Sequence, residues 1–483
     1  MQTLNDPQLL RNHSYINGSW HASENQLMVT NPATGEVIAQ VSDAAVGEVD
    51  LAVKAAKQAM PLWSSLAAAE RAKLMRKWFD LIIEHQEDLA TILTLEQGKP
   101  LAEARGEITY GAAYIEWFAE EGKRVYGDTI PAPSSDKRIV ITKQAVGVVA
   151  SVTPWNFPNA MIARKAAAAL AAGCTFIGRP ASQTPLSALA MAELAERSGM
   201  PPGVFNIIVG DDARGIGEVL TQHPDIAKFT FTGSTQVGRQ LIAQCASTIK
   251  KVSMELGGNA PFIVFDDADV DAAVQGAIAS KYRNAGQTCV CTNRIFVQSG
   301  IAQVFTEKYK QAVAKLTLGN GLTEGVNIGP MISPQAVANV HELVTASVSL
   351  GAKVVTGGEL LEAGSHYYPP TVLSDVTNDM PIAQQEIFGP VAPIITFDSE
   401  EQVITLANNT EYGLAAYFYS RDIGRVWRVS EKLEYGMVGI NEGIISNAAA
   451  PFGGVKQSGN GREGSKYGLD DYLELKYLCM GGI

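Results

Sequence analysis

The sequence predicts an α/β protein with two doubly wound domains and a small additional β-sheet, and three observations predict this fold class. First, short apolar segments alternate with helix-like segments along most of the 483 residues. Near-continuous apolar strands between helices are typical of a parallel sheet covered on both faces. Second, the alternation starts again after Gly257-Gly258, and the length suits two or three domains. Third, two strand-like stretches, within 124–145 and at the C-terminus, stand outside the alternation.

The first series of elements ends near residue 257. Residues 68–98 carry apolar side chains at helical spacing and end in a glycine, so they predict one long amphipathic helix. A second helix is predicted over residues 164–173, where Gly173 closes it. The predicted strands of this series are 146–152, 175–178, 204–210 and 226–233, and its other helices are 185–198 and two that start at 213 and 234.

The second series follows without a proline-rich linker, so we expect the two domains to pack closely. Its predicted strands are 261–265, 294–298, 392–397, 415–420 and 437–441, and its predicted helices are 268–281 and one from 301. Segment 124–145 and the C-terminal DDYLELKYLCM can pair into a projecting sheet. An exposed sheet of this kind predicts a contact between subunits.

Composition excludes several classes of protein. Hydrophobic residues make up 46% and charged residues 18%, which is ordinary for a soluble globular chain. The net charge is −12 and no basic patch stands out, so nucleic acid and anionic membranes are not expected partners. Residues 144–163 form a long uncharged stretch, but two prolines and two asparagines make it unsuitable as a membrane span. Five scattered cysteines and no apolar leader favour a cytoplasmic location.

Cys289 is the first candidate for chemistry. It follows a Gly-Gln-Thr turn, where backbone N–H groups lower a thiol pKa and hold an oxyanion. The alternative is a buried structural cysteine, since free cysteines are among the most buried residues. A protease-like nucleophile would need a histidine, and none of the six histidines lies in a motif-like context.

Two further residues could assist a nucleophile. Glu255 ends an apolar strand directly before Gly257-Gly258, where the lack of side chains lets a carboxylate approach a ligand. Asn156 lies between two prolines that fix the backbone, and its amide can donate to a developing oxyanion. Taken singly, Glu255 also fits a solvated strand-end carboxylate, and Asn156 fits a helix cap.

Three strand-to-turn segments are candidates for binding a cofactor. FTGSTQVG at 231–238 contains Gly233, Ser234 and Gly238 and suits a phosphate at a helix N-terminus, although packing glycines would also fit. Each of the other two segments contains two residues that could contact a cofactor. They are GRPASQTP with Arg179 and Ser182, and QEIFGP with Glu386 for a ribose hydroxyl and Phe388 for a flat ring.

Taken together, the motifs are far more specific than any one of them. In chain order they are PWNFP at 154–158, RPASQTP at 179–185, FTGSTQVG at 231–238, MELGGNAP at 254–261, GQTC at 286–289, EIFGP at 386–390 and PFGGVKQSGNGREG at 451–464. With these motifs the sequence resembles the aldehyde dehydrogenase superfamily over essentially its full length. Stretches such as LEQGKPLAEARGEI and RNAGQTCVC make it most similar to the bacterial succinate-semialdehyde dehydrogenases.

The resemblance implies a fold and a mechanism. Residues 1–123 and 146–257 would form a Rossmann-like cofactor domain, and residues 258–466 a catalytic domain. The remaining segments, 124–145 and 467–483, would form an arm that builds a homodimer or homotetramer. Cys289 would attack an aldehyde, with the oxyanion held by Asn156 and the Cys289 N–H, and Glu255 would activate water to hydrolyse the thioester.

The resemblance also assigns cofactor contacts. Glu386 would bind the nicotinamide ribose, Phe388 would lie against the nicotinamide, and Ser234 and Trp155 would contact the pyrophosphate region. Two positions depart from the usual pattern: Arg179 stands where the family usually has lysine, and Ser182 where many NAD-specific members have glutamate. Arg179 and Ser182 together favour a 2′-phosphate, so the sequence predicts NADP over NAD, with NAD also possible.

For the substrate, the resemblance points to Arg164, Arg283 and Ser446 as groups that bind a distal carboxylate. It favours succinate semialdehyde, with glutarate semialdehyde or a broader range of ω-oxo acids and aliphatic aldehydes as alternatives. Without the resemblance, a pair of structural arginines would be the favoured explanation. A CoA-acylating enzyme is disfavoured by Glu255, and a catalytically silent binding protein by the presence of the whole catalytic set.

Cys291 lies two residues after the proposed nucleophile. A C-x-C pair without a nearby histidine is weak evidence for a metal, and no metal is expected. A reversible bridge between Cys289 and Cys291 would be tight and easily reduced, so oxidants are predicted to switch the enzyme off through this pair.

Overall fold

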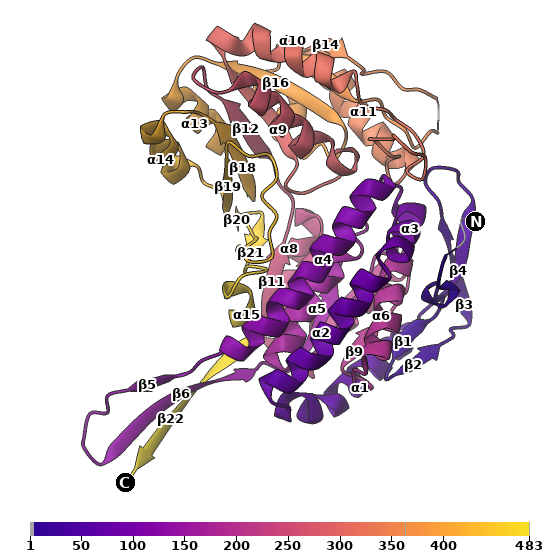
Figure 1. The fold of residues 1–483 in the computed structure, drawn as a ribbon, viewed down its shortest axis with the longest axis vertical. Helices are drawn as coiled ribbons and strands as arrows, with labels where there is room; N and C mark the ends of the chain where they lie inside the picture. Colours follow the sequence, from indigo (N-terminus) through magenta and orange to yellow (C-terminus); the bar gives the residue numbers. More distant parts are fainter. Residues whose placement is uncertain (1–3, 363, 483) are drawn as a thin grey trace.

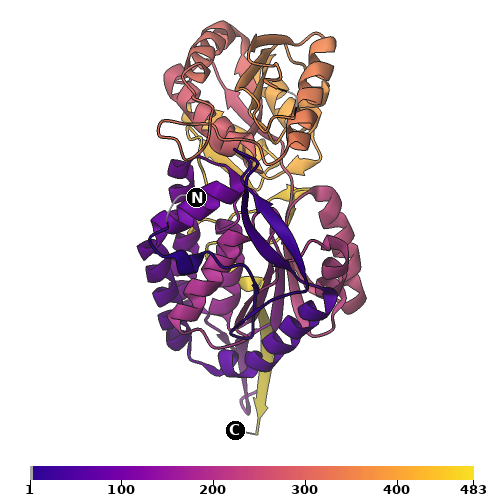
Figure 2. The same cartoon turned by 90° about the vertical axis from the view of Figure 1, so that its right-hand side faces the viewer.

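The computed structural model describes residues 4–362 and 364–482, so residues 1–3, 363 and 483 of the expected domain ranges lie outside the described part. Two sheet-containing bodies are stacked along the long axis, and a narrow β arm projects from the end of the larger one (Figures 1 and 2). Helices cover both faces of each sheet, as the alternation of elements predicts.

The first sheet has the strand order β2-β1-β9-β8-β7-β10-β11-β21, and its β7 to β11 pairs are parallel. Its strands are β1 (Ser14–Ile16), β2 (Ser19–His21), β7 (Val148–Val152), β8 (Thr175–Arg179), β9 (Phe205–Ile207), β10 (Ile226–Thr232), β11 (Lys251–Glu255) and β21 (Gly459–Asn460). The order reverses between β7 and β10. Ligands of open α/β sheets bind outside the carboxyl ends of the strands at such a reversal.

Helices of the first body cover this sheet, and the hairpin of β3 (Asn25–Thr30) and β4 (Val37–Asp43) lies beside it. These helices are α1 (Val46–Ser65), α2 (Ala68–Glu84), α3 (Gln86–Gln97), α4 (Leu101–Glu121), α5 (Ala160–Ala172), α6 (Leu186–Ser198), α7 (Ala213–Gln222) and α8 (Thr235–Cys245). The single helix predicted over 68–98 is therefore wrong. The chain leaves helical geometry at His85 (φ −97°, ψ 19°), so α3 starts in a new direction although apolar residues continue at helical spacing.

The second sheet has the order β14-β15-β16-β13-β12-β18-β19 and is parallel except for β14. Its strands are β12 (Ala260–Val264), β13 (Thr292–Gln298), β14 (Lys353–Thr356), β15 (Thr371–Ser374), β16 (Val391–Phe397), β18 (Ala415–Tyr419) and β19 (Met437–Ile440). The helices of this body are α9 (Val270–Tyr282), α10 (Ala302–Val313), α11 (Pro334–Ser349), α12 (Pro381–Gln384), α13 (Glu400–Asn408) and α14 (Ile423–Lys432).

The C-terminal segment returns to the first body. Strands β17 (Tyr412–Gly413) and β20 (Val455–Lys456) pair with each other, and β21 then joins the edge of the first sheet beside β11. The range 258–466 therefore does not stay within the second sheet. After α15 (Tyr467–Asp470) the chain enters the arm.

The arm is a sheet of β5 (Asp128–Ile130), β6 (Lys137–Ala145) and β22 (Leu473–Gly481), in the order β22-β6-β5. β22 pairs antiparallel with β6 along its full length, so the two stretches outside the alternation do form one sheet. Leu475 and Tyr477 on β22 are 70% and 61% exposed. Among the described helices, none is both long and apolar enough to span a bilayer.

Candidate active site

The sequence motifs converge where the two bodies meet. The loops after β7, β10 and β11 leave the carboxyl ends of the first sheet, while the loop before β13 reaches the amino end of the second. Two cavities, of about 280 and 290 Å³, share Cys289 as a lining residue. We call the one lined by α4 and α5 the first cavity and the one lined by the turns after β7 and β10 the second cavity.

Cys289 is half-buried between these cavities. Packed atoms around the thiol raise its pKa to about 12, because burial disfavours the thiolate more than the charge of Arg164 favours it. From the sequence, backbone N–H groups are expected to lower the pKa of the Cys289 thiol, whereas burial shifts this pKa in the opposite direction. Burial therefore favours the neutral thiol over the thiolate at Cys289.

Glu255 is a buried carboxyl group on the wall of the second cavity. It ends β11, is 2% exposed, and lines the second cavity together with Cys289. Its Oε2 has no hydrogen-bond partner among the described residues. Burial and the negative charge of Glu463 raise the pKa of Glu255 well above that of an ordinary carboxyl, so it holds a proton more readily than a solvated glutamate does.

The glycines after Glu255 are required by close approaches. A Cβ on Gly258 would lie 2.4 Å from the carbonyl oxygen of Cys289, and one on Gly257 would lie 2.9 Å from Glu386 Oε2. Both distances are too short for a side chain. The pair of glycines therefore lets the loop after β11 pass directly beneath the loop before β13 that carries Cys289. We call the latter the cysteine loop.

Asn156 faces the same loop. It is 3% exposed, and its Nδ2 donates to the carbonyl of Gln287 at 3.0 Å. A primary amide carries two N–H donors, so one can orient the group while the second stays available to an oxyanion beside Cys289. The geometry favours this role over a helix cap, since the Asn156 side chain makes no capping bond to α5.

The second cavity contains most of the expected cofactor residues. Trp155, Gly233, Ser234, Glu386 and Phe388 line it. Ser234 caps α8, since its hydroxyl accepts a hydrogen bond from the N–H of Val237, so the N-terminal end of this helix lies at the wall of the cavity. The rings of Trp155 and Phe388 meet edge to face, with centroids 5.6 Å apart.

Glu386 is held at the border of this cavity. Its Oε1 accepts a hydrogen bond from the N–H of Gly258 at 2.9 Å, and burial raises its pKa to about 7. Gly238 does not line the cavity. A Cβ there would lie 2.5 Å from Leu256, so this glycine lets α8 pack against the loop after β11, which is the packing role considered above.

Arg179 and Ser182 do not line the second cavity: Arg179 is the last residue of β8, and Ser182 lies in the turn that follows. Arg179 is largely buried, and its Nη2 donates to the carbonyl of Gly210 at 2.7 Å. Its Nε has no partner among the described residues. Ser182 lines a separate polar cavity of about 380 Å³ together with Asp211.

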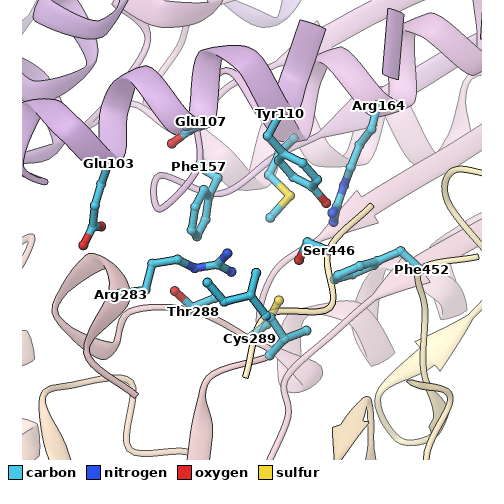
Figure 3. Close-up of a pocket in the computed structure, with 14 residues that line it drawn as sticks. Glu103, Glu107, Tyr110, Phe157, Arg164, Arg283, Thr288, Cys289, Ser446 and Phe452 are labelled. Carbon is cyan, nitrogen blue, oxygen red and sulfur yellow. The ribbon is translucent and has the colours of Figure 1, made fainter. Parts of the chain in front are cut away.

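The three expected substrate residues all line the first cavity. Figure 3 shows Arg164 and Arg283 reaching toward it from different sides, with Ser446 and Cys289 between them. Arg164 is 1% exposed, forms an ion pair with Glu463, and lies over the Phe452 ring at 4.4 Å. Arg283 is half-buried and makes no ion pair with any described residue, so its charge is the more available of the two.

Several lining residues were missed by sequence reasoning. Glu103, Gly106, Glu107 and Tyr110 reach the first cavity from one face of α4, Met161 comes from the start of α5, and Phe157 comes from the turn before it. The spacing of residues 103, 106 and 110 is that of a helix face, which is the signal that could have found them. It does not reveal what the face contacts.

Comparison with known proteins agrees with this arrangement. The aldehyde dehydrogenase family model matches residues 20–478. The chain belongs to the aldehyde dehydrogenase family. It is 58% identical to the glutarate-semialdehyde dehydrogenase of Pseudomonas aeruginosa, with 99% of this chain and 100% of that one covered. It is also 58% identical to the NADP(+) succinate-semialdehyde dehydrogenase of Escherichia coli, with 99% of each chain covered.

A solved aldehyde dehydrogenase structure gives the same result for the fold. The succinate-semialdehyde dehydrogenase of Burkholderia pseudomallei superposes with a TM-score of 0.98 at 56% identity, covering 99% of this chain and 100% of that one. The expected superfamily and the aldehyde dehydrogenase fold are therefore confirmed.

Proposed function

We propose that this aldehyde dehydrogenase oxidises ω-oxo acids, with succinate semialdehyde as the preferred substrate and NAD(P) as oxidant. The observation that carries the proposal is a single cavity with Cys289 and two arginines on its wall. An aldehyde carbon at Cys289 leaves a short chain pointing toward guanidinium groups that match a carboxylate. Similarity to relatives named for semialdehydes supports the same reading.

The chemistry begins with proton transfer from Cys289 Sγ to Glu255, because the thiol is neutral at rest. The thiolate attacks the aldehyde carbon, and the oxygen becomes an oxyanion held by the Asn156 amide and the Cys289 N–H. Trp155, Ser234, Glu386 and Phe388 would hold a nicotinamide cofactor in the second cavity, and that group would supply the acceptor for the hydride of this carbon. The carbon is then a thioester. Glu255 passes the proton taken from Cys289 to solvent and then removes a proton from the water that hydrolyses the thioester, so the Cys289 thiolate is released and the product is a carboxylate.

The position of the distal carboxylate group decides which chain length of substrate fits the first cavity. Since Glu463 already pairs with Arg164, we assign the distal carboxylate mainly to Arg283, with the Ser446 hydroxyl as an additional donor. Glutarate semialdehyde is one methylene longer. A methylene changes recognition by only about 1–3 kcal/mol, so it remains the main alternative substrate.

The test measures initial rates of reduced-cofactor formation with succinate semialdehyde, glutarate semialdehyde and butyraldehyde. Butyraldehyde has the length of succinate semialdehyde but lacks its carboxylate. We expect kcat/KM for the carboxylate substrates to exceed that for butyraldehyde by on the order of 100-fold, as a charged hydrogen bond of about 1.5–3 kcal/mol to Arg283 implies. Equal efficiency with butyraldehyde would instead support a broad aliphatic aldehyde dehydrogenase, and binding without turnover would support a silent binding protein.

We also propose a moderate preference for NADP over NAD. The residues fit a 2′-phosphate because the buried Nε of Arg179 is an unused donor and Ser182 carries no negative charge. Three carboxylates, Asp43, Asp211 and Asp212, lie near Arg179 and limit the preference. The NADP(+) named for the Escherichia coli relative supports the proposal.

Replacing Ser182 by glutamate is expected to lower kcat/KM for NADP by on the order of 10–100-fold, since like charges placed together cost several kcal/mol. The value for NAD should stay within about threefold, because NAD carries no phosphate at this position. Initial rates with both cofactors check this, and Ser182→Ala is the control that removes the hydroxyl without adding charge. An equal loss with both cofactors would contradict the assignment.

We assign cofactor binding to the first sheet body, the nucleophile to the second, and assembly into a homodimer or homotetramer to the arm. Exposed apolar residues on β22 support the last point. A cytoplasmic location fits the five cysteines, which are all free thiols.

The thiol pair is proposed as a redox switch. Cys291 is buried, and its Sγ donates to the carbonyl of Lys281 at 3.0 Å. Peroxide would oxidise Cys289 and Cys291 to a disulfide and be reduced to water. We expect thiol-reversible inactivation of the parent and irreversible inactivation of Cys291→Ala, measured as residual activity after peroxide and then dithiothreitol. If Cys291→Ala is inactivated and rescued just like the parent, the switch does not exist.

A further inference from the structure

We propose that Lys99 is a positioning residue that fixes the Asn156 amide against the cysteine loop, an inference that rests on the proposed function. Lys99 lies outside both cavities and touches no position that a substrate atom would occupy. It occupies the corner between α3 and α4, where Gly98 in a left-handed conformation (φ +95°) ends α3 and Pro100 precedes α4. We call Gln97, Lys99, Glu107 and Asn284 the Lys99 clasp.

The ammonium group of Lys99 is buried beneath Asn156. The side chain is 1% exposed, and Nζ donates to Glu107 Oε2 at 2.6 Å and to the backbone carbonyl of Asn156 at 2.8 Å. It also lies 3.7 Å from the centroid of the Phe157 ring. A buried cation that contacts a carboxylate, a carbonyl and an aromatic face has little freedom to move, so it holds the Asn156 backbone in one place.

Glu107 also fixes the other end of the loop that carries Asn156. Its Oε1 accepts hydrogen bonds from the N–H groups of Asn159 and Ala160, at 3.0 and 3.2 Å, at the start of α5. One ion pair on α4 therefore fixes both ends of the segment that carries the amide. The direction of the Asn156 side chain follows from that fixed backbone.

Asn284 connects the clasp to the cysteine loop. Its Nδ2 donates to the Asn156 carbonyl at 3.0 Å, and its Oδ1 accepts from Gln97 Nε2 at 2.9 Å. Gln97 in turn accepts from the N–H of Lys99 at 3.0 Å. The carbonyl oxygen of Asn156 thus accepts hydrogen bonds from both Lys99 and Asn284. This one acceptor connects the loop that carries Asn156 to the cysteine loop.

The cysteine loop needs such a hold because its backbone is strained. Asn284 and Ala285 have φ values of +52° and +54°, a left-handed conformation that non-glycine residues rarely adopt twice in succession. Strained residues persist where surrounding contacts over-determine them. The clasp supplies those contacts five residues before Cys289, so it sets the separation of nucleophile and oxyanion donor.

The expected effect is on the chemical step. A shift of about 1 Å in a catalytic group costs on the order of 100-fold in rate. We expect Lys99→Met to lower kcat by about that factor, with KM for aldehyde and cofactor changed less than about threefold, because Lys99 itself lines neither cavity. Since this variant leaves Glu107 buried without its partner, the double variant Lys99→Met/Glu107→Gln removes both charges and keeps the Oε1 acceptor.

The decisive test is a double-mutant cycle with Asn156→Ala, with thermal melting to establish folding at the assay temperature. If Lys99 acts through the Asn156 amide, removing the ion pair in the Asn156→Ala background should lower kcat by less than about threefold further. The full 100-fold loss in that background would overturn the proposal. The matched control is Lys250→Met, because Lys250 is a buried lysine that donates to backbone carbonyls of His223 and Ile226 away from the site. An equal loss in this control would also overturn it.

A second readout separates this inference from the proposed function. Hydrolysis of 4-nitrophenyl acetate needs the thiolate, the oxyanion donor and water but no hydride acceptor. Cys289 expels 4-nitrophenolate to form a thioester, and water then releases acetate. The Lys99 variants should lose this cofactor-free activity by the same factor as aldehyde oxidation. If the wild-type chain hydrolyses the ester but oxidises no ω-oxo acid, the proposed substrate is wrong while the Lys99 test still applies. An unchanged ester rate in the Lys99 variants would contradict the inference directly.

Discussion

Replacing Cys289 by alanine is expected to lower kcat for aldehyde oxidation by on the order of 10⁴-fold or more, as for other enzymes that lose their nucleophile. The methyl group cannot form a covalent adduct, so hydride transfer would have to start from an aldehyde hydrate rather than from a thiohemiacetal. The Asn156 amide would remain in place because its visible hydrogen bond is to the Gln287 carbonyl, not to the thiol. Binding of cofactor and aldehyde should therefore survive.

The measurement compares single-turnover rates and cofactor affinity for the parent and Cys289→Ala. The control is Cys245→Ala, a free cysteine buried at the end of α8 and remote from both cavities. It should keep parental kcat and lose only some stability, because it removes one buried sulfur. Substantial turnover by Cys289→Ala would mean that another group carries the chemistry, and the mechanism above would have to be abandoned.

Much of the fold could be predicted from local pattern. The apolar run 148–152 is a strand because a strand whose two faces are both covered does not need alternating polar residues. The break at His85 could not be predicted, because apolar residues continue at helical spacing on both sides of it. The return of β21 to the first sheet is equally invisible, since two residues of strand carry no periodicity.

The site divides in the same way. Motif residues at strand ends could be predicted, because parallel strands bring their carboxyl ends to one edge of a sheet. The contribution of α4 could not, since residues 103, 106 and 110 identify a helix face but not its partner. The direction of the pKa shift at Cys289 could not be predicted from the local sequence. Local N–H groups were considered, whereas packing from several distant segments decides the pKa of Cys289.

Replacing Glu255 by glutamine is expected to separate the two halves of the reaction. Glutamine keeps the size of the side chain but removes the base, so steady-state kcat should fall by on the order of 10²–10⁴-fold. A thioester that forms slowly and then hydrolyses even more slowly would accumulate, giving up to one equivalent of reduced cofactor per active site before turnover stalls. Rapid-mixing absorbance measurements would show this burst, and hydroxylamine should release the trapped acyl group.

The rates of acylation and of thioester hydrolysis are both expected to rise with pH. Since burial and Glu463 raise the pKa of Glu255, lowering the pH protonates the base and the parental hydrolysis rate should fall, while raising the pH should increase it. The pKa of Cys289 is also raised, so the acylation rate should rise with pH as well. In Glu255→Gln the base-dependent rise in hydrolysis should disappear, while acylation keeps the slope set by the thiol. If hydrolysis in this variant retained the parental pH profile, Glu255 would not be the base that activates water.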